Sequence, residues 1–221
     1  METNIFTQVD EYIDNLLAPE DQVLKDTIKS LDLEGIPQIS VSSGQGKFLQ
    51  VLVKMCNASR ILELGTLGGY STIWLARALP ENGKLISIEL EPHHAHAAQK
   101  NIENAKLANK VEIRTGKAIE MLPAMIDKQE GPFDFIFIDA DKPPYAEYFD
   151  YAVKLSRPGT IIVCDNVIRH GNVLDSNHSD EKVQGVQRFN KMLAEDKRVT
   201  AIILQTVGIK GHDGMAISVV N

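Results

Sequence analysis

The sequence predicts an α/β fold, in which a mostly parallel sheet is covered by helices on both faces. From residue 60 onward, short apolar runs alternate with amphipathic stretches of helical length. This alternation requires crossover connections and therefore parallel strands. The last two apolar runs are separated only by a short loop that carries glycines, so their strands should be antiparallel neighbours. We therefore expect a seven-stranded, doubly wound sheet that ends in an antiparallel hairpin.

Residues 1–57 are predicted to form helices that precede the sheet. Apolar residues recur there at helical spacing. Pro19 suits the first turn of a second helix, and Ser43 is expected to cap a third. A chain of 221 residues can bury one core without a second domain. We therefore expect a single domain over residues 1–221.

The apolar runs and the amphipathic stretches between them give the expected elements of the sheet region. The predicted strands are 60–64, 84–89, 111–114, 133–139, 160–165, 199–207 and 215–220. The predicted helices are 70–79, 92–108, 118–128, 145–155 and 182–194. Ligands of such a sheet are expected to bind beyond the carboxyl ends of its strands.

Composition and charge narrow the class of protein. The net charge of -7 argues against a nucleic acid as the main partner, because phosphate contacts need clustered Lys and Arg. No apolar run approaches the roughly 20 residues of a membrane helix, and the N-terminus lacks the features of a secretory signal. Cys56 and Cys164 lie in apolar sequence without metal or redox spacing. We expect a cytoplasmic protein with two free thiols.

A glycine-rich turn follows the first predicted strand, with the sequence ELGTLGGYS at residues 63–71. Its GxxGG spacing differs from the GxGxxG of dinucleotide folds, and S-adenosylmethionine (SAM) has no pyrophosphate to cradle. The next strand ends in Glu89, where a carboxylate can accept both hydrogen bonds of a ribose diol. These features favour a SAM pocket over an NAD pocket. The alternative is that the glycines only permit a tight turn and that Glu89 caps a helix.

Oxygen-bearing side chains close two later strands. Asp139 ends one apolar run, and Asp165 and Asn166 end the next. If these strands are neighbours, the three side chains converge on one rim, and such a set suits Mg²⁺ with positions left open for vicinal hydroxyls. Taken singly, such residues are more often turn or capping residues.

Lys142 follows Asp139 by three residues, so one loop can present a metal ligand and an amine to the same site. A bound cation would stabilise a deprotonated catechol and disfavour a second positive charge beside it. Lys142 is therefore predicted to act as a general base. The alternative is a solvated loop lysine paired with Asp141.

At these residues the chain resembles the class I, cation-dependent O-methyltransferases, the family of catechol and caffeoyl-coenzyme A O-methyltransferases and their bacterial relatives. The resemblance extends from Gln45-Gly46 to Asp165-Asn166. It implies a Rossmann-like class I methyltransferase fold, a homodimer, a ribose held by Glu89, a metal held by Asp139, Asp165 and Asn166, and Lys142 as the catalytic residue. The cofactor pocket that it implies is lined by Val41, Glu63, Gly65, Thr66, Ser71, Ala118 and Asp139.

The residues that hold the acceptor are less defined. In the animal catechol enzymes an aromatic residue follows the metal aspartate, whereas this chain has Ala140-Asp141, closer to the plant and bacterial pattern. Tyr145, Arg169 and His170 are candidates for the acceptor platform by their position.

The predicted function is metal-dependent methyl transfer from SAM to a hydroxyl of a small catechol-like aromatic, such as a flavonoid, a caffeoyl compound or a simple catechol. One alternative keeps the scaffold and methylates a hydroxylated uridine in transfer RNA. Two others are a nicotinamide-dependent dehydrogenase and a non-catalytic nucleoside-binding module.

Overall fold

The computed structural model describes residues 2–221, with side chains from residue 5 onward, so Met1 lies outside the described residues. The strands are β1 (Arg60–Leu64), β2 (Lys84–Glu89), β3 (Val111–Thr115), β4 (Phe133–Ile138), β5 (Ser156–Asp165), β6 (Val199–Thr206) and β7 (Asp213–Val220). The α-helices are α1 (Glu2–Leu17), α2 (Gln22–Leu33), α3 (Ser43–Met55), α4 (Tyr70–Ala78), α5 (Pro92–Asn104), α6 (Ala118–Asp127), α7 (Tyr145–Lys154) and α8 (Glu181–Glu195). A 3₁₀ helix, η1 (Arg169–Leu174), lies between β5 and α8.

The strands form one seven-stranded sheet in the order β3-β2-β1-β4-β5-β7-β6. Strands β1 to β5 run parallel, whereas β7 is antiparallel to both of its neighbours, β5 and β6. This confirms the predicted parallel sheet with a reversed hairpin. The sequence did not indicate that β7 would enter between β5 and β6.

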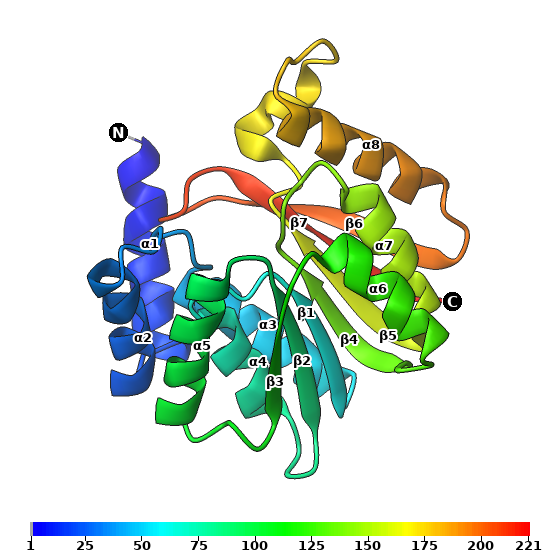
Figure 1. The fold of residues 1–221 in the computed structure, drawn as a ribbon. Coiled ribbons are helices and arrows are strands. Elements are labelled where there is room, and N and C mark those ends of the chain that lie inside the picture. The colour runs from blue at the N-terminus through cyan, green and yellow to red at the C-terminus, as the bar shows by residue number, and fades with distance from the viewer. Residues whose placement is uncertain (1) are drawn as a thin grey trace.

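Helices cover both faces of the sheet, as Figure 1 shows. The helices α2 to α5 pack together on one face, and α6 to α8 pack together on the other. Strand β4 is buried along its whole length. Its alternate residues contribute to two apolar clusters, with Ile136 on the α6–α8 side and Phe137 on the α2–α5 side. The central strands are thus held from both sides, which fixes the positions of their carboxyl ends.

Two predicted helix starts are wrong. Helix α2 begins at Gln22 rather than at Pro19, because the carboxylate of Asp21 accepts a hydrogen bond from the amide of Leu24 and caps the helix. Helix α3 is capped by Ser42 rather than by Ser43. Ser42 and Gln45 exchange side-chain and backbone hydrogen bonds in a capping box.

The other predicted elements are present, with boundaries that shift by a few residues. The sequence missed η1, whose backbone is irregular: Arg169, His170 and Gly171 all have positive φ. Cys56 and Cys164 are both free thiols, as expected. No helix among the described residues is long and apolar enough to cross a membrane.

Helix α1 packs on the rest of the chain through polar residues. Asp10 accepts a hydrogen bond from the amide of Ile209 at 2.8 Å, and Asp14 accepts one from the hydroxyl of Ser43 at 2.6 Å. The apolar residues that predicted this helix lie in solvent instead, with 66% of Tyr12 and 68% of Leu17 exposed. The helix is where the sequence placed it, but its apolar side does not join the core.

Candidate active site

The carboxyl ends of β1, β2 and β4 meet at one rim of the sheet. The amide of Gly65, just after β1, donates to the carbonyl of Ile88 at 2.9 Å, and the amide of Asp139, just after β4, donates to the carbonyl of Leu64 at 2.8 Å. Residues that are far apart in the sequence are therefore held side by side by continuing backbone hydrogen bonds. Strands β4 and β5, which lead to Asp139 and Asp165, are neighbours too, as the predicted convergence of Asp139, Asp165 and Asn166 requires.

The glycine-rich turn needs glycine for two physical reasons. Gly65 has a φ of +93°, and a Cβ on it would come within 2.1 Å of the carbonyl oxygen of Asp139. Gly69, at the start of α4, has a φ of +86°. Side chains at these positions would strain the backbone or separate the turn from β4. The turn thus approaches the backbone after β4 closely, as a nucleoside pocket between β1 and β4 requires.

Glu89 holds the glycine-rich turn in place. One carboxylate oxygen accepts hydrogen bonds from the amides of Thr66 and Leu67 at 2.9 and 2.8 Å, and the other accepts from the amide of Glu91 at 3.0 Å. Glu89 therefore binds the backbone of the turn and does not cap a helix, as the alternative interpretation had it, because neither α4 nor α5 has a side-chain cap hydrogen bond. A carboxylate has about four acceptor positions, so the predicted contact with a ribose diol remains compatible with these bonds.

Glu63 is completely buried behind the turn. Its carboxylate accepts hydrogen bonds from the hydroxyls of Ser71, Thr72 and Ser87 at 2.6, 2.5 and 2.7 Å. Burial raises the pKa of Glu63 to about 7, although the three hydroxyls lower it. Glu63 and Ser71 therefore connect β1, β2 and α4 beneath the predicted cofactor pocket, with their polar groups directed at each other.

The other residues predicted to line the cofactor pocket lie beside these elements. Thr66 is buried, and its hydroxyl shares a hydrogen bond with that of Ser87. Val41 is buried directly before the Ser42 cap of α3, in the same apolar cluster as Tyr70. Ala118 is the first residue of α6, which follows β3. The predicted set thus comes from the segment before α3 and from the four connections that follow β1, β2, β3 and β4.

The acidic side of the rim is formed by Asp139 and Asp165. Asp165 ends β5 and is only 2% exposed, whereas the side chain of Asp139 is 26% exposed. Burial and the nearby charge of Asp139 raise the pKa of Asp165 to about 7. The two carboxylates are therefore close enough to repel each other, and a cation between them would relieve that repulsion.

Asn166 completes the predicted oxygen set. The backbone N–H of Asn166 donates to a carboxylate oxygen of Asp165 at 2.8 Å, and the φ of Asn166, +58°, lies in the left-handed region. Among the described side chains, those of residues 5–221, no three His, Cys, Asp or Glu gather as a metal-binding cluster. The predicted set contains two carboxylates and one amide, so it depends on the Asn166 oxygen. Two hard anionic donors and an amide fit a divalent cation of the Mg²⁺ type.

Lys142 lies at the centre of this acidic rim and is 6% exposed. Its ammonium donates to Asp139 at 2.9 Å, to the phenol oxygen of Tyr145 at 2.6 Å and to the carbonyl of Asp165 at 3.3 Å. The Asp141 carboxylate, the alternative partner, instead accepts a hydrogen bond from Tyr148. The structure therefore places Lys142 with the predicted metal ligands and not in a solvated loop.

Tyr145 cannot be part of the acceptor platform, because it is fully buried. Its hydroxyl lies within hydrogen-bond distance of the carbonyls of Ile138 and Asp165 as well as of Lys142. Tyr145 thus anchors the Lys142 ammonium between β4 and β5. Sequence reasoning missed this role, and the only signal for it was the three-residue spacing that places both side chains near the start of α7.

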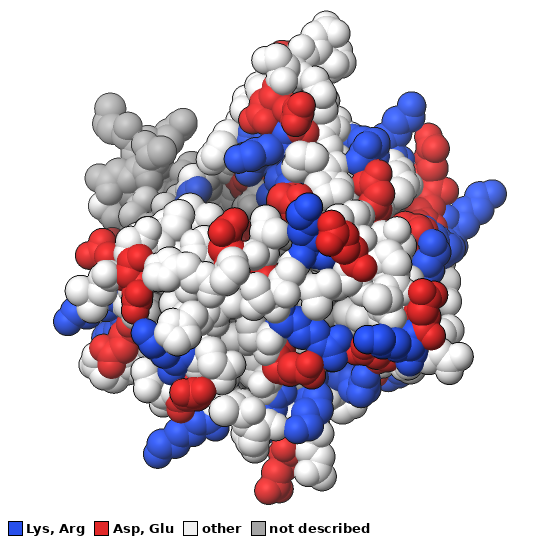
Figure 2. Space-filling model, viewed as in Figure 1, with Lys and Arg blue, Asp and Glu red and all other residues white. Residues whose placement is uncertain are grey.

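Charged side chains of both signs are mixed over the face that Figure 2 shows, without an extended field of one sign. The net charge of the chain is -7. A nucleic acid would require a continuous basic surface around its binding site, and this face does not present one.

Known proteins resemble this chain over nearly its whole length. A family model described as O-methyltransferase matches residues 15–219. A catechol O-methyltransferase from Niastella koreensis is 59% identical over 220 residues and covers 100% of both chains. The structure of an O-methyltransferase from Bacillus cereus in complex with SAH is 47% identical, with a TM-score of 0.96, and covers 99% of this chain and 100% of that chain. The O-methyltransferase TomG from Streptomyces achromogenes, involved in tomaymycin synthesis and solved with SAM, is 45% identical, with a TM-score of 0.96 and coverage of 100% and 99%.

Proposed function

Because the chain belongs to the O-methyltransferase family and is a SAM-dependent O-methyltransferase, we propose that it methylates one of two vicinal hydroxyls on a small catechol-like aromatic. The observation that carries this proposal is the buried Lys142 ammonium, which lies between Asp139 and the Asp165 strand end at the rim beside the glycine-rich turn. The name of the relative from Niastella koreensis supports a catechol as the acceptor.

The family assignment rules out a nicotinamide-dependent dehydrogenase and a non-catalytic nucleoside-binding module. Methylation of a hydroxylated uridine in transfer RNA uses the same scaffold, and it is supported neither by the net charge nor by the mixed charges in Figure 2. It becomes an outcome of the experiment below.

We propose that SAM binds between the glycine-rich turn and the ends of β2 and β4. Gly65 and Gly69 give the backbone room to approach it, and Glu89 has acceptor positions left for the ribose hydroxyls beyond its bonds to Thr66 and Leu67. Glu63, with Ser71, would hold this turn from beneath. The methyl group of SAM would then face the acidic rim.

We propose that Asp139, Asp165 and Asn166 hold a divalent cation, with Mg²⁺ as the first candidate. The fit rests on two carboxylates and one amide at the same rim, where burial and then the charge of Asp139 raise the pKa of Asp165. When bound, such a cation would supply positive charge that stabilises a deprotonated acceptor hydroxyl. The coordination positions that the protein does not fill would suit two neighbouring hydroxyl groups, so a single-hydroxyl phenol should be a poor acceptor.

Lys142 is the group that takes the proton in this proposal. With a cation bound at Asp139 and Asp165, the neighbouring Lys142 ammonium would be disfavoured and would give up a proton to water. The neutral amine then removes the proton from the reacting hydroxyl, the oxygen attacks the methyl carbon, and the carbon–sulfur bond breaks to leave S-adenosylhomocysteine (SAH). The resulting ammonium is stabilised by the acceptors that surround it, the Asp139 carboxylate, the Tyr145 hydroxyl and the Asp165 carbonyl. Holding the reactants in line can itself be worth roughly 7 to 11 kcal/mol.

The test is a mass-spectrometric assay of the purified protein with SAM, a panel of catechols and matched single-hydroxyl phenols. Each reaction is run with Mg²⁺ and with a chelator. Methylation of the catechols alone, abolished by the chelator, is the expected result. Methylation of hydroxylated transfer RNA with no catechol product would support the transfer RNA alternative and refute a small-molecule acceptor.

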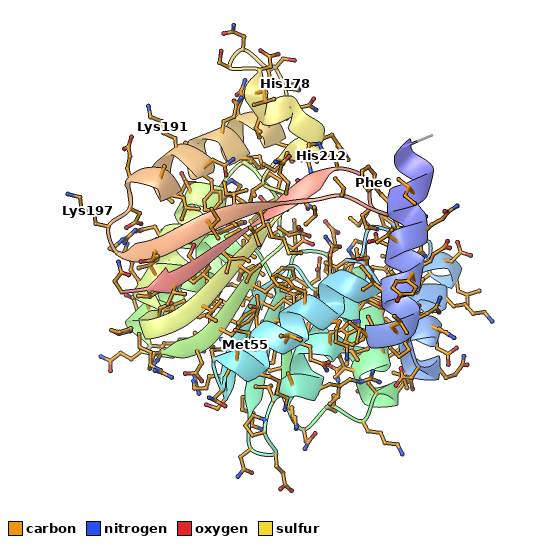
Figure 3. All side chains as sticks on the ribbon, turned by 180° about the vertical axis from the view of Figure 1, so that it is seen from behind. Phe6, Met55, His178, Lys191, Lys197 and His212 are labelled. Atoms are coloured by element: carbon orange, nitrogen blue, oxygen red, sulfur yellow. The ribbon has the colours of Figure 1, made fainter. Side chains whose placement is uncertain are left out.

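We also propose that residues 1–221 act as one domain that assembles as a homodimer. Apolar side chains are exposed on α1, on α3 and on the uncovered face of β6 and β7, which lie toward the viewer in Figure 3. This outer apolar face comprises Val9, Tyr12, Ile13, Leu16, Val51, Met55, Ile202, Leu204 and Val219.

A second copy of the chain is the proposed occupant of this face, because it would cover the apolar side of α1 without disturbing the polar contacts of Asp10 and Asp14. Leu16→Asp should therefore shift the mass measured by sedimentation from that of a dimer to that of a monomer. Lys25→Asp, outside the face, serves as the control for an added charge. A wild-type protein that sediments as a monomer at micromolar concentration would refute the homodimer.

A further inference from the structure

A loop beyond the predicted metal ligands borders the site on the side away from the glycine-rich turn. It runs from Asn166 into η1, which Figure 1 shows above the carboxyl ends of β4 and β5. Arg169 and His170 in this loop, like Asn166, have positive φ, with values of 53°, 57° and 58°. Such backbone conformations cost free energy and persist only where the surroundings impose them. They therefore point to a function for the loop.

Asp213 is the residue that imposes this conformation. It is buried at the start of β7, and one carboxylate oxygen accepts hydrogen bonds from the amides of Ile168 and Arg169 at 3.0 and 2.9 Å. The neighbouring amide of Val167 donates to the carbonyl of Gly214 at 3.0 Å. The loop is thus tied to β7 on both sides of Ile168, and the backbone of Arg169 is held in one place.

The guanidinium of Arg169 has no partner among the side chains of residues 5–221. Its Nε is buried without a hydrogen bond, and no acidic group of these residues pairs with it. Every other arginine of the chain donates from its guanidinium to a carboxylate or a carbonyl; these are Arg60, Arg77, Arg114, Arg157, Arg188 and Arg198. A partly buried cation without a partner is unfavourable, so its position beside the site calls for a ligand.

Arg169 also acts electrostatically on the interior of the site. Burial raises the pKa of Tyr145 well above its usual value, and the charge of Arg169 opposes this rise. Since Tyr145 anchors Lys142, the Arg169 charge lies near the acidic rim rather than in open solvent. The site therefore carries the carboxylates of Asp139 and Asp165 and, within electrostatic range of the same Tyr145, the unpaired cation of Arg169.

We infer that Arg169 is a specificity-determining residue that binds a carboxylate carried by the catechol ring. This inference rests on the proposed function, because the vicinal hydroxyls must lie at Asp139 and Asp165 for the far side of the ring to reach Arg169. A guanidinium presents a planar pair of donors that matches a carboxylate and forms stronger hydrogen bonds with it than with a neutral group. The preferred acceptors are accordingly acidic catechols.

The experiment compares 3,4-dihydroxybenzoate with 3,4-dihydroxybenzyl alcohol, which differ in the charge of the ring substituent. Wild type should have the lower KM for the acid. Arg169→Gln should raise the KM for the acid about tenfold or more, as expected for one lost charged hydrogen bond, and should change the KM for the alcohol less than twofold. Arg188→Gln, at a solvent-exposed arginine paired with Glu147, is the matched control and should change neither value.

Equal KM changes for the two acceptors, or none for the acid, would overturn the inference. If wild type methylates neither catechol, the proposed function fails instead. The inference is then decided by calorimetric binding of the two compounds in the presence of SAH. It stands only if wild type binds the acid more tightly than the alcohol and Arg169→Gln removes this difference.

Asp213 provides a second, independent test. Asp213→Ala should free the amides of Ile168 and Arg169 and raise the KM for the acid in the same direction as Arg169→Gln. Asp213→Asn keeps an oxygen acceptor at the same place and should restore most of the acid preference. If Asp213→Ala retains the acid preference of wild type, Asp213 does not position Arg169.

Discussion

Two buried aspartates lie at opposite ends of the neighbouring strands β4 and β5, and their surroundings differ. Asp134, near the start of β4, accepts hydrogen bonds from the amides of Ser59 and Arg60 and pairs with Arg157 at 2.7 Å. Burial opposes its charge, but these partners prevail and lower its pKa. Asp165, at the end of β5, has a pKa raised to about 7 by burial and by the charge of Asp139.

The difference separates a carboxylate that stabilises the fold from one that we propose binds a cation. Asp134 pairs with Arg157 and accepts hydrogen bonds from two backbone amides, so it joins three segments of the fold. Lys142 pairs with the carboxylate of Asp139 but contacts Asp165 only at its backbone carbonyl, which leaves negative charge that a ligand can compensate. Uncompensated, pKa-shifted groups of this kind are concentrated at functional sites.

The largest effect is expected when the two aspartates are neutralised one at a time, and Asp165 is the first. Asp165→Asn should lower kcat/KM by about 10³-fold, because loss of the cation removes several kcal/mol of transition-state stabilisation. Calorimetry should show the loss of Mg²⁺ binding, while the melting temperature without metal stays the same or rises. If Mg²⁺ binding and chelator-sensitive activity survive, Asp165 is not a metal ligand.

Lys142→Ala tests the lysine at the acidic rim, whose ammonium pairs with the Asp139 carboxylate. Its kcat should fall by roughly 10²- to 10³-fold, which is the usual contribution of a general base. The dissociation constant for SAM, measured by calorimetry, should stay within about twofold because Lys142 does not contact the glycine-rich turn. A variant that loses SAM binding instead would show that Lys142 supports the pocket and is not the base.

Asp134→Asn is the matched change at the other end of the strands. The free energy of unfolding, measured in urea, should fall by about 2–4 kcal/mol because the amides of Ser59 and Arg60 and the half-exposed guanidinium of Arg157 lose the negative charge that they bind. Since the folded-state pKa of Asp134 is lowered, its contribution is present above the ordinary carboxyl pKa and is lost as the pH falls. The difference from wild type should therefore shrink toward low pH. Activity per folded molecule should not change, and a large loss of kcat would show that this end also serves catalysis.

Glu63→Gln tests a third buried carboxylate through the pH dependence of the free energy of unfolding. Burial raises the pKa of Glu63 from 4.5 to about 7. Below pH 4.5 the group is protonated in both the folded and the unfolded state. Between pH 4.5 and 7 the unfolded state ionises first, so the stability of the folded state falls by up to about 3 kcal/mol.

Gln cannot ionise, so Glu63→Gln removes this loss. The free energies of unfolding of wild type and Glu63→Gln should therefore diverge between pH 5 and pH 8, with wild type relatively weaker at pH 8. Groups common to both proteins cancel in this difference. A difference that is independent of pH would mean that Glu63 is ionised throughout this range.

Much of this fold was predictable because its signals are local. The alternation of apolar runs with amphipathic stretches depends on residues a few positions apart, and it located every strand and every helix after residue 60 apart from η1. The convergence of Asp139 and Asp165 followed from topology, because the carboxyl ends of neighbouring parallel strands meet at one rim. The positions of Lys142 and Gly65 at that rim followed from the same argument.

Contacts between distant segments were not predictable. Nothing in the sequence around Asp213 indicates that it binds the amides after Asn166, and nothing near Tyr145 indicates that its hydroxyl reaches the Asp165 carbonyl. The start of α2 was misplaced because Pro19 suits a first turn as well as the residues after the Asp21 cap do. The cap of α3 was misplaced because two adjacent serines compete for it. Only hydrogen-bond geometry distinguishes among them.

Helix α1 shows the limit of what the sequence predicts. Its 3.6-residue periodicity determined that the segment is an amphipathic helix, because that property depends only on neighbouring side chains. The tertiary structure decided that Asp10 and Asp14 dock on the chain while Tyr12 and Leu16 face outward. The local pattern specifies that an apolar side must be covered but not what covers it, since the covering surface comes from residues far away in the sequence or from another molecule.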